Sequence, residues 1–287
     1  MVERVMELIF TACGFAAIVC VVCMTAYMII SGGPGIAKVG VVGFLFGRAW
    51  MPNFDQFGIL SMIASSLVAT TAAVLIALPI GVLVAVFLAK LAPGRVANAL
   101  RAVIDLLAGI PSVVYGLLGA TLIAPMIYSV QTAAGLPKGG CLLSAVIILV
   151  IMILPTIISV SETAIRAVPK KYEDASLALG STKLQSIFRV TVPAAKSGIA
   201  AGMVLGVGRA IGEAMAVMMV AGNAVMMPEL LSPVRLLTVS IPMEWAYSTG
   251  LHRQALSGIG LVLFFFIMIV NILLNRVLKK GGGAGDR

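Results

Sequence analysis

Charge is scarce in this sequence. Only 11% of its 287 residues are charged and 61% are hydrophobic, whereas a soluble domain carries roughly 25% charged residues. The apolar excess is too large for one buried core, so the chain is expected to lie in lipid. Its apolar runs are continuous rather than alternating, which is typical of spanning helices and excludes a closed barrel of strands.

Groups that serve catalysis, metal binding or nucleotide binding are also few. The only histidine, His252, is isolated in an expected outer loop, which argues against an enzyme acting on lipids. Three of the four cysteines lie in the first apolar run, where they are interpreted as small apolar residues. No GxxxxGK[ST] motif is present, so the chain is not expected to bind ATP phosphates. We expect no catalytic residue, metal or cofactor in this chain.

Six apolar segments are long enough to cross a bilayer, which needs about 20 residues each. They are Val5–Ile30, Gly58–Lys90, Ile104–Val130, Cys141–Ile165, Gly198–Met226 and Leu256–Leu278. The sequence therefore predicts an all-α integral membrane protein with six transmembrane helices. The first run lacks a small-residue cleavage site, so no cleavable signal peptide is expected.

The basic residues indicate how the chain is oriented. Fourteen of the 20 lysines and arginines fall in the linkers that share a side with both termini, and five fall in the other linkers. Positive residues stay inside, so both termini are predicted to be cytoplasmic, with outer segments at about 31–57, 131–140 and 227–255. This bias explains the net charge of +9 without a nucleic-acid partner, for which no aromatic-basic platform is visible.

The predicted organisation has three parts. Residues 1–57 hold the first transmembrane helix and an outer loop, residues 58–280 form a core of five helices, and residues 281–287 are a flexible glycine-rich tail. The core includes a long cytoplasmic loop at 166–197, which is too polar for lipid.

The cytoplasmic loop has the pattern of two short helices around a glycine elbow. Pro169 suits the first turn of a helix, and Gly180 suits a left-handed residue that ends it. Thr182 and Gln185 have capping-box spacing at the start of the next helix. On that helix Leu184, Ile187 and Phe188 share one face, and Pro193 ends the unit. This apolar knob beside a bend could dock into a partner's groove or could rest on lipid headgroups.

Two charges fall inside the fifth predicted span. Arg209 and Glu213 each cost roughly 2.5–3.5 kcal/mol at the bilayer centre, and their spacing of four places them on one face of a helix. They could form a self-satisfied pair that fixes packing, or a pore-facing site at which the planar guanidinium meets an oxyanion. Small residues that would permit close helix approach nearby are Gly202, Gly206, Gly208 and Gly212.

The third predicted span contains a helix breaker. Pro111 removes a main-chain hydrogen bond and invites a kink, beside the hydroxyls of Ser112 and Tyr115. The kink could line a substrate path or could only shape packing. Two acids are interpreted as structural: Asp105 at the start of this span, and Glu162, which is spaced to pair with Arg166.

The cytoplasmic loop resembles the EAA loop of ABC importer permeases. The family motif E-A-A-x3-G-x9-I-x-L-P aligns with Asp174-Ala175-Ser176-x3-Gly180 and, nine residues later, with Val190-Thr191-Val192-Pro193. Asp replaces Glu, Ser replaces the second Ala, and Val replaces Ile and Leu. The resemblance implies a coupling helix that fits a cleft on an ATP-hydrolysing subunit. Its coupling residues would be Glu173, Asp174, Ala175, Gly180, Leu184, Ile187, Phe188 and Pro193.

Three further strings resemble the phosphate-specific permeases of PstC type. They are the run from Gly208 to Val217 followed by Gly222-Asn223, the run from Ile110 to Gly116, and the outer run from Phe44 to Gly58. The resemblance implies that Arg209 and Glu213 serve phosphate passage, with Pro111, Ser112 and Tyr115 along the path. Ala214 stands where the family usually has threonine, so one possible hydroxyl contact is missing.

The resemblance implies a multi-pass subunit of a bacterial plasma-membrane phosphate importer. Its partners would be a second permease of PstA type, two ATPases of PstB type that bind ATP and Mg, an extracytoplasmic phosphate-binding protein of PstS type, and membrane lipid. Two alternatives stay open: a permease for another oxyanion such as sulfate or molybdate, and a stand-alone anion carrier or channel.

Overall fold

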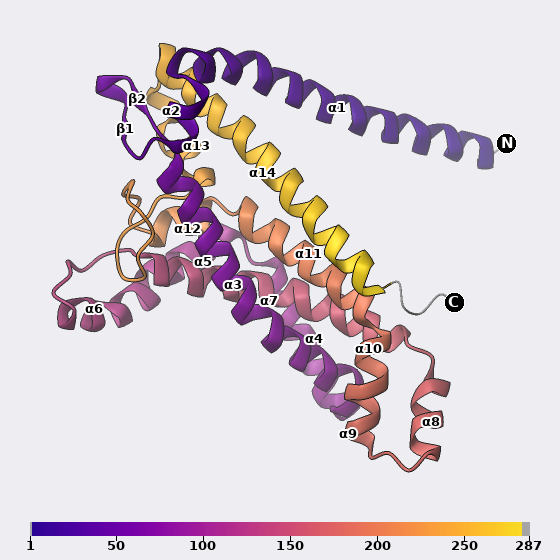
Figure 1. Ribbon diagram of the computed structural model, residues 1–287. Coiled ribbons are helices and arrows are strands. Elements are labelled where there is room, and N and C mark those ends of the chain that lie inside the picture. Colours follow the sequence, from indigo (N-terminus) through magenta and orange to yellow (C-terminus); the bar gives the residue numbers. More distant parts are fainter. Residues whose placement is uncertain (1, 283–287) are drawn as a thin grey trace. The chain divides into compact units, whose positions relative to one another are not determined.

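The computed structural model describes residues 2–282, and the chain divides there into two compact units. The first comprises residues up to Leu60 together with Ser240–Phe265, and the second comprises Ser61–Val239 and the residues from Phe266 onward. Almost all regular structure is helical (Figure 1).

The first unit is built on two long helices and a small hairpin. Its elements are α1 (Val2–Val39), α2 (Val41–Phe46), β1 (Trp50–Met51), the 3-10 turn η1 (Pro52–Phe54), β2 (Gln56–Phe57), the 3-10 turn η5 (Trp245–Tyr247), and the first part of α14 (Gly250–Gly282). α1 and α14 cross at glycines, because a Cβ on Gly32 would lie 2.7 Å from the main-chain nitrogen of Gly258. Trp50 pairs with Phe57 across the antiparallel hairpin.

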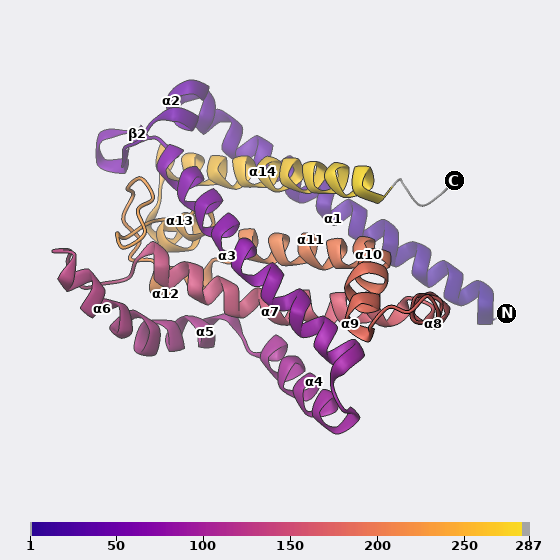
Figure 2. The same cartoon turned by 60° about the horizontal axis from the view of Figure 1, so that its bottom comes forward.

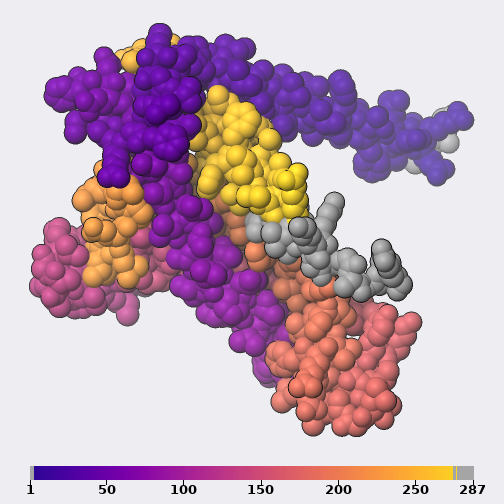
Figure 3. All heavy atoms as spheres, viewed as in Figure 1, coloured from indigo at the N-terminus to yellow at the C-terminus, as the bar shows by residue number. Residues whose placement is uncertain are grey.

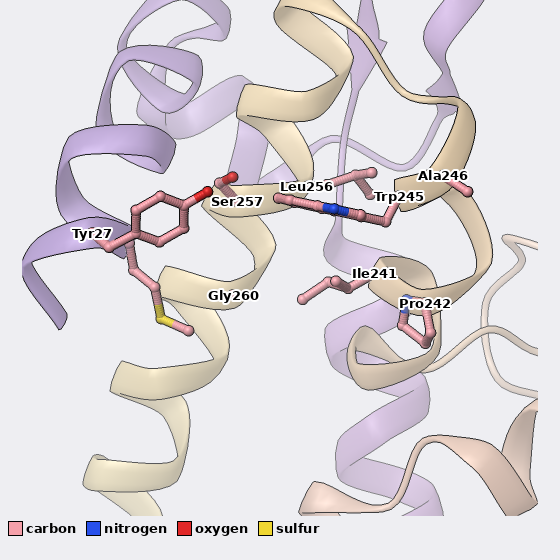
Figure 4. A pocket seen from close by; sticks show the side chains of 9 residues that line it. Tyr27, Ile241, Pro242, Trp245, Ala246, Leu256, Ser257 and Gly260 are labelled. Atoms are coloured by element: carbon pink, nitrogen blue, oxygen red, sulfur yellow. The ribbon is translucent and has the colours of Figure 1, made fainter. Parts of the chain in front are cut away.

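An apolar cavity of about 510 Å³ lies in the first unit. Tyr27 and Met28 of α1, Trp245 of η5 and Leu256 of α14 contribute to its wall (Figure 4). No residue of the lining carries a charge. A wall of this kind would desolvate an anion without compensation, so this cavity is not the candidate anion site.

The second unit surrounds α7. Its elements are α3 (Leu60–Val86), η2 (Phe87–Leu91), α4 (Gly94–Gly109), α5 (Ser112–Leu118), η3 (Gly119–Ile123), α6 (Ala124–Ala133), α7 (Leu142–Ala167), α8 (Lys170–Ala178), α9 (Lys183–Ser186), η4 (Ile187–Thr191), α10 (Val192–Ala194), α11 (Lys196–Gly212), α12 (Met215–Val220) and the start of α13 (Leu237–Glu244), whose residues from Ser240 onward belong to the first unit. The segments η2, η3 and η4 are π-helical. Side chains along much of α7 are buried, and α11 runs beside it (Figures 1 and 2).

The contact between α11 and α7 depends on glycines four residues apart. A Cβ on Gly206 would lie 2.9 Å from Cγ1 of Ile157, and one on Gly202 would lie 3.3 Å from Oγ of Ser161. Gly198 approaches Ala164 in the same way. Small residues at this spacing let helices approach closely in lipid. The prediction is confirmed for Gly202 and Gly206 and wrong for Gly208 and Gly212, where an added Cβ meets nothing within 4 Å.

These glycines provide a matched test of packing within one helix. We expect Gly206→Ala to lower the free energy of unfolding by about 1–3 kcal/mol because it overpacks the contact with α7. Gly208→Ala should instead leave stability unchanged or raise it by about 0.5–1 kcal/mol, since alanine favours helix and has open space there. Thermal unfolding of the purified chain in detergent, followed by circular dichroism, measures both. Equal effects of the two substitutions would contradict the packing argument.

The predicted spans are recovered with corrections at their ends. Within residues 2–282, five helices are long and apolar enough to cross a membrane, or six if the bent pair Lys183–Ala194 and Lys196–Gly212 counts as one span. The third span starts at Ser112 rather than Ile104, because the helix breaks before Pro111. The fifth is not continuous to Met226, because α11 ends at Gly212. The cytoplasmic location of the termini stays a prediction.

Two predicted loop segments are helical. α1 continues to Val39, so the outer segment expected from residue 31 begins later. α14 reaches Gly282, so the first two residues of the predicted tail are helical. Helix extends into these glycines although each costs about 1 kcal/mol relative to alanine. The rest of the predicted tail, residues 283–287, lies outside the described residues.

Candidate functional site

The fifth predicted span breaks at Glu213. The backbone of this residue is extended, with φ −73° and ψ 122°, and α12 begins two residues later. The Glu213 carboxylate accepts a hydrogen bond from the Ala216 N–H at 3.0 Å, which caps the new helix. The Glu213 carbonyl, freed by the break, accepts one from the Thr238 hydroxyl at 2.9 Å.

The break separates Glu213 from Arg209. Among residues 2–282 no ion pair joins the two side chains, so of the two alternatives the self-satisfied pair is contradicted. Arg209 lies on the face of α11 that meets α7, and its Nη1 approaches the Thr156 hydroxyl at 3.5 Å. That contact is long and weak. Arg209 is half-buried and keeps a charge that no described carboxylate balances.

The predicted break at Pro111 is confirmed, and the Tyr115 hydroxyl forms a hydrogen bond across it. Pro111 stands at the N-terminus of α5, and α4 and α5 leave the break in different directions (Figure 2). The Tyr115 hydroxyl donates to the Leu107 carbonyl at 2.7 Å and so ties α5 back to α4. Ser112 is half-buried at the first position of α5. Tyr115 is therefore occupied in holding the break, which the sequence did not indicate.

α5, which starts at the Pro111 break, packs against α12. A Cβ on Gly116 would lie 2.9 Å from Cα of Ala216, so the two helices touch at their backbones. A Cβ on Gly119 would collide with the side chains of Val220 and Ile148. The broken third span and the segment after Glu213 thus form one packed region. Thr156 and Thr238 are polar members of it that sequence reasoning missed, although Thr156 follows a proline within an apolar run.

The cytoplasmic elbow has the predicted local geometry. Gly180 has φ +86°, and Ser181 N–H and Gly180 N–H donate to the Ser176 and Leu177 carbonyls at 3.3 and 2.9 Å, which is a Schellman motif. Both bonds of the Thr182–Gln185 capping box are present. The elbow therefore joins α8 to α9 as predicted, and this segment projects at one end of the second unit (Figure 3).

The apolar knob has a different composition from the predicted one. Leu179 at the elbow is 90% exposed, and Leu184 and Phe188 are also exposed, whereas Ile187 is fully buried. Ile187 packs with Leu88 and Ile165 in the core of the unit, so it anchors the segment instead of facing outward. Asp174 and Ala175 are exposed on α8.

Pro193 is the last residue but one of the unit, so the predicted end is confirmed to within one residue. It lies at the start of α10, the helical segment continues to Ala194, and the chain bends by 67° before α11.

One of the two acids interpreted as structural, Glu162, forms ion pairs. Glu162 accepts from Arg166 at 2.8 Å, as predicted, and also from Arg101 at 2.7 Å. Asp105 lies within α4 rather than at the start of a span, on the wall of a cavity of about 410 Å³ that this cluster lines. Glu173, a predicted coupling residue, forms an ion pair with Lys90 at 2.8 Å.

His252 is not isolated. It lies in the first turn of α14, and its Nε2 is 2.8 Å from the Glu244 carboxylate, which also accepts from the Trp50 indole at 2.8 Å. The ring stacks on Phe57 within the first unit. The prediction is corrected because strand residues distant in sequence fold against α14.

A model of a known protein family matches residues 77–280, which is more than half of the chain. The description of that family is "Binding-protein-dependent transport system inner membrane component". The chain belongs to this family. It is therefore a multi-pass membrane permease of an ABC transporter, and this type of subunit is not itself catalytic.

Full-length relatives agree with this assignment. The chain is 37% identical to the probable ABC transporter permease YqgH of Bacillus subtilis, over 94% of this chain and 90% of that protein. It is 34% identical to the phosphate transport system permease protein PstC of Pasteurella multocida, over 83% of this chain and 81% of that one. PstC of Xylella fastidiosa is 32% identical over 88% of this chain and 84% of that one.

Solved permease structures share the fold. A chain of the bacterial alginate ABC transporter superimposes with a TM-score of 0.68 at 13% identity, covering 98% of this permease and 97% of that chain. A chain of the MetNI methionine transporter gives 0.57 at 19% identity, covering 78% and 94%. At these identities the likeness concerns architecture only.

Proposed function

We propose that this permease forms the translocation path for inorganic phosphate in an ATP-driven importer. The observation that carries the proposal is the unbalanced charge of Arg209, a guanidinium within a spanning helix whose described contact is a threonine hydroxyl at 3.5 Å. A planar guanidinium binds tetrahedral oxyanions through paired hydrogen bonds. Similarity to phosphate permeases of PstC type over most of the chain supports phosphate as the anion.

The position of Glu213 refines this proposal. Its carboxylate caps α12 instead of neutralising Arg209, so the arginine keeps its donors for a passing anion. The acid beside the path still contributes negative potential, which would limit the residence time of the anion. Conduction requires binding that is weak enough for release. Pro111 and Ser112 would contribute to the path where α5 starts, while Tyr115 would hold its shape.

Coupling would pass through α8, the elbow and α9. Leu179, Leu184 and Phe188 expose apolar side chains that suit a groove on an ATPase subunit. Asp174, Ala175 and Gly180 would lie in the same contact. Ile187 and Glu173 would hold this segment against the rest of the second unit. The complete importer would contain a second permease of PstA type, two ATPases of PstB type that carry ATP and Mg, and an extracytoplasmic phosphate-binding protein of PstS type.

A reconstituted importer tests the substrate and the class together. We expect proteoliposomes containing the chain with these partners to take up radiolabelled phosphate only when ATP is inside and binding protein outside. Unlabelled phosphate should compete, while sulfate and molybdate in roughly hundredfold excess should reduce uptake by less than about twofold, because the binding protein selects the anion. Omitting the binding protein is the control.

Two outcomes would overturn this proposal. Uptake that needs neither ATP nor an ATPase subunit, or purification of the chain without any ATPase, would favour a stand-alone carrier or channel. Equal competition by sulfate or molybdate would favour a permease for another oxyanion.

A further inference from the structure

The end of α3 leaves a buried carbonyl without a main-chain donor. In the π-helical turn η2 the Ala92 N–H donates to the Phe87 carbonyl at 2.8 Å, five residues back. In this pattern the next carbonyl, that of Leu88, would need the N–H of residue 93, which is Pro93 and has none. Leu88 is 1% exposed. A buried carbonyl of this kind requires another donor.

Two arginines supply that donor from different elements. Arg166 of α7 donates through Nη2 to the Leu88 carbonyl at 2.8 Å, and Arg101 of α4 approaches it at 3.4 Å. Their Nε atoms both donate to one oxygen of the buried Glu162, at 2.8 and 2.7 Å. The cluster joins η2, α4 and α7 through charge-assisted bonds.

The same turn holds the coupling segment. Lys90, two residues after Leu88, pairs with Glu173 of α8 at 2.8 Å, and the side chains of the two are only 15% and 13% exposed. The main-chain carbonyl of Glu173 also accepts from the Ser186 hydroxyl at 3.4 Å, on the other side of the elbow. Breaking an enclosed pair costs more than breaking an exposed one. η2 therefore holds both arms of the elbow.

The far end of α4 reaches the broken third span. The Leu107 carbonyl, in the last turn of α4, accepts the Tyr115 hydroxyl across the Pro111 break. Beyond it Gly116 touches Ala216, whose N–H donates to Glu213. A continuous series of contacts thus leads from the coupling segment to the region beside Arg209.

We propose that Glu173, Lys90, Arg101, Glu162 and Arg166 form a polar relay that transmits movement of the coupling segment to α4 and the Pro111 break. They are positioning residues and do not touch the anion. The proposal rests on the proposed function because it requires an ATPase bound at the elbow to drive the movement. It goes beyond that function by naming the side chains that transmit the movement. A purely local role would be to cap the end of α3 and hold the elbow in shape.

A cysteine probe at the break separates these roles. The four native cysteines are first changed to alanine, and Val113, an exposed residue of α5, is then replaced by cysteine. The rate at which a methanethiosulfonate reagent modifies this cysteine is measured in the assembled complex, with and without a non-hydrolysable ATP analogue. This Val113→Cys protein is the parent for four variants. They are Lys90→Met, Glu173→Gln, the reversed pair Lys90→Glu with Glu173→Lys, and the control Arg95→Met at an exposed arginine.

We expect the nucleotide to change the modification rate about tenfold in the parent and in the Arg95→Met control, and less than about twofold in each single variant. The reversed pair should restore at least half of the response on a logarithmic scale, and all complexes should retain their ATPase subunits. Recovery by the reversed pair would be unexpected if each residue acted only through its own local packing.

Several results would overturn the relay. These are a full response in the single variants, no response in the parent, failure of the reversed pair to recover, or a lost response that accompanies loss of the ATPase from the complex. Failure of the proposed function would be seen separately, as absent phosphate uptake by the unmodified importer, because the cysteine measurement needs no phosphate.

Discussion

Replacing Arg209 by glutamine should reduce phosphate uptake by at least about thirtyfold, from a loss of about 2 kcal/mol or more in anion binding. Glutamine keeps a neutral, polar side chain, but it is shorter than arginine and loses the charge, the paired donors and the reach of Nη1 to the Thr156 hydroxyl. The glutamine amide cannot compensate the charge of a phosphate that has left its hydration shell. Uptake into proteoliposomes, at equal amounts of assembled complex, measures the effect.

The controls for Arg209 separate charge from geometry. Arg95→Gln removes an exposed arginine at the start of α4 and should leave uptake within about twofold of the starting protein. Arg209→Lys keeps the charge without the planar fork, so it should give an intermediate rate. ATPase subunits should co-purify with every variant. Intact uptake by Arg209→Gln would assign this arginine to packing against α7 alone.

The unpaired state of Arg209 could not be predicted from the sequence. Spacing of four residues indicates a shared helix face only while the helix continues, and Gly212-Glu213-Ala214 contains no proline to mark a break. The break is stabilised from a distance, by the Thr238 hydroxyl that donates to the Glu213 carbonyl from another segment. A hydrogen bond between residues 25 positions apart leaves no trace in local pattern.

Local features were predictable where local chemistry determines them. The elbow depends on Gly180, Thr182 and Gln185, which are neighbours in sequence, and the break at Pro111 depends on the proline itself. The Lys90–Glu173 pair joins residues 83 positions apart, so no local sequence pattern could predict it. The same holds for Ile187, whose burial follows from the direction in which its helix packs on the core.

The extent of α1 shows how tertiary contact overrides local signals. The run Ser31-Gly32-Gly33-Pro34-Gly35 is typical of a turn, yet the helix continues through it to Val39. Gly32 and Gly35 meet α14 where an added Cβ would collide with its backbone. The residues that weaken the helix locally are therefore those that permit the helix crossing within the first unit.

Replacing Gly180 by valine should uncouple ATP hydrolysis from transport. Valine at φ +86° costs about 1–3 kcal/mol, and no neighbour lies within 4 Å of the added Cβ, so the effect is conformational rather than steric. The elbow would relax, the Ser181–Ser176 hydrogen bonds would weaken, and Leu179 would leave its position at the tip. We expect phosphate transported per ATP hydrolysed to fall about tenfold.

Asparagine distinguishes backbone conformation from the loss of glycine itself. Gly180→Asn adds a polar side chain of comparable bulk, but asparagine tolerates the left-handed conformation. The ratio of transport to hydrolysis should therefore stay within about threefold of the starting protein. Equal losses in the valine and asparagine variants would mean that the docking surface cannot accept any side chain at the elbow. A normal ratio in the valine variant would mean that force reaches the spans by another route, because a strained elbow could not then be the element that carries it.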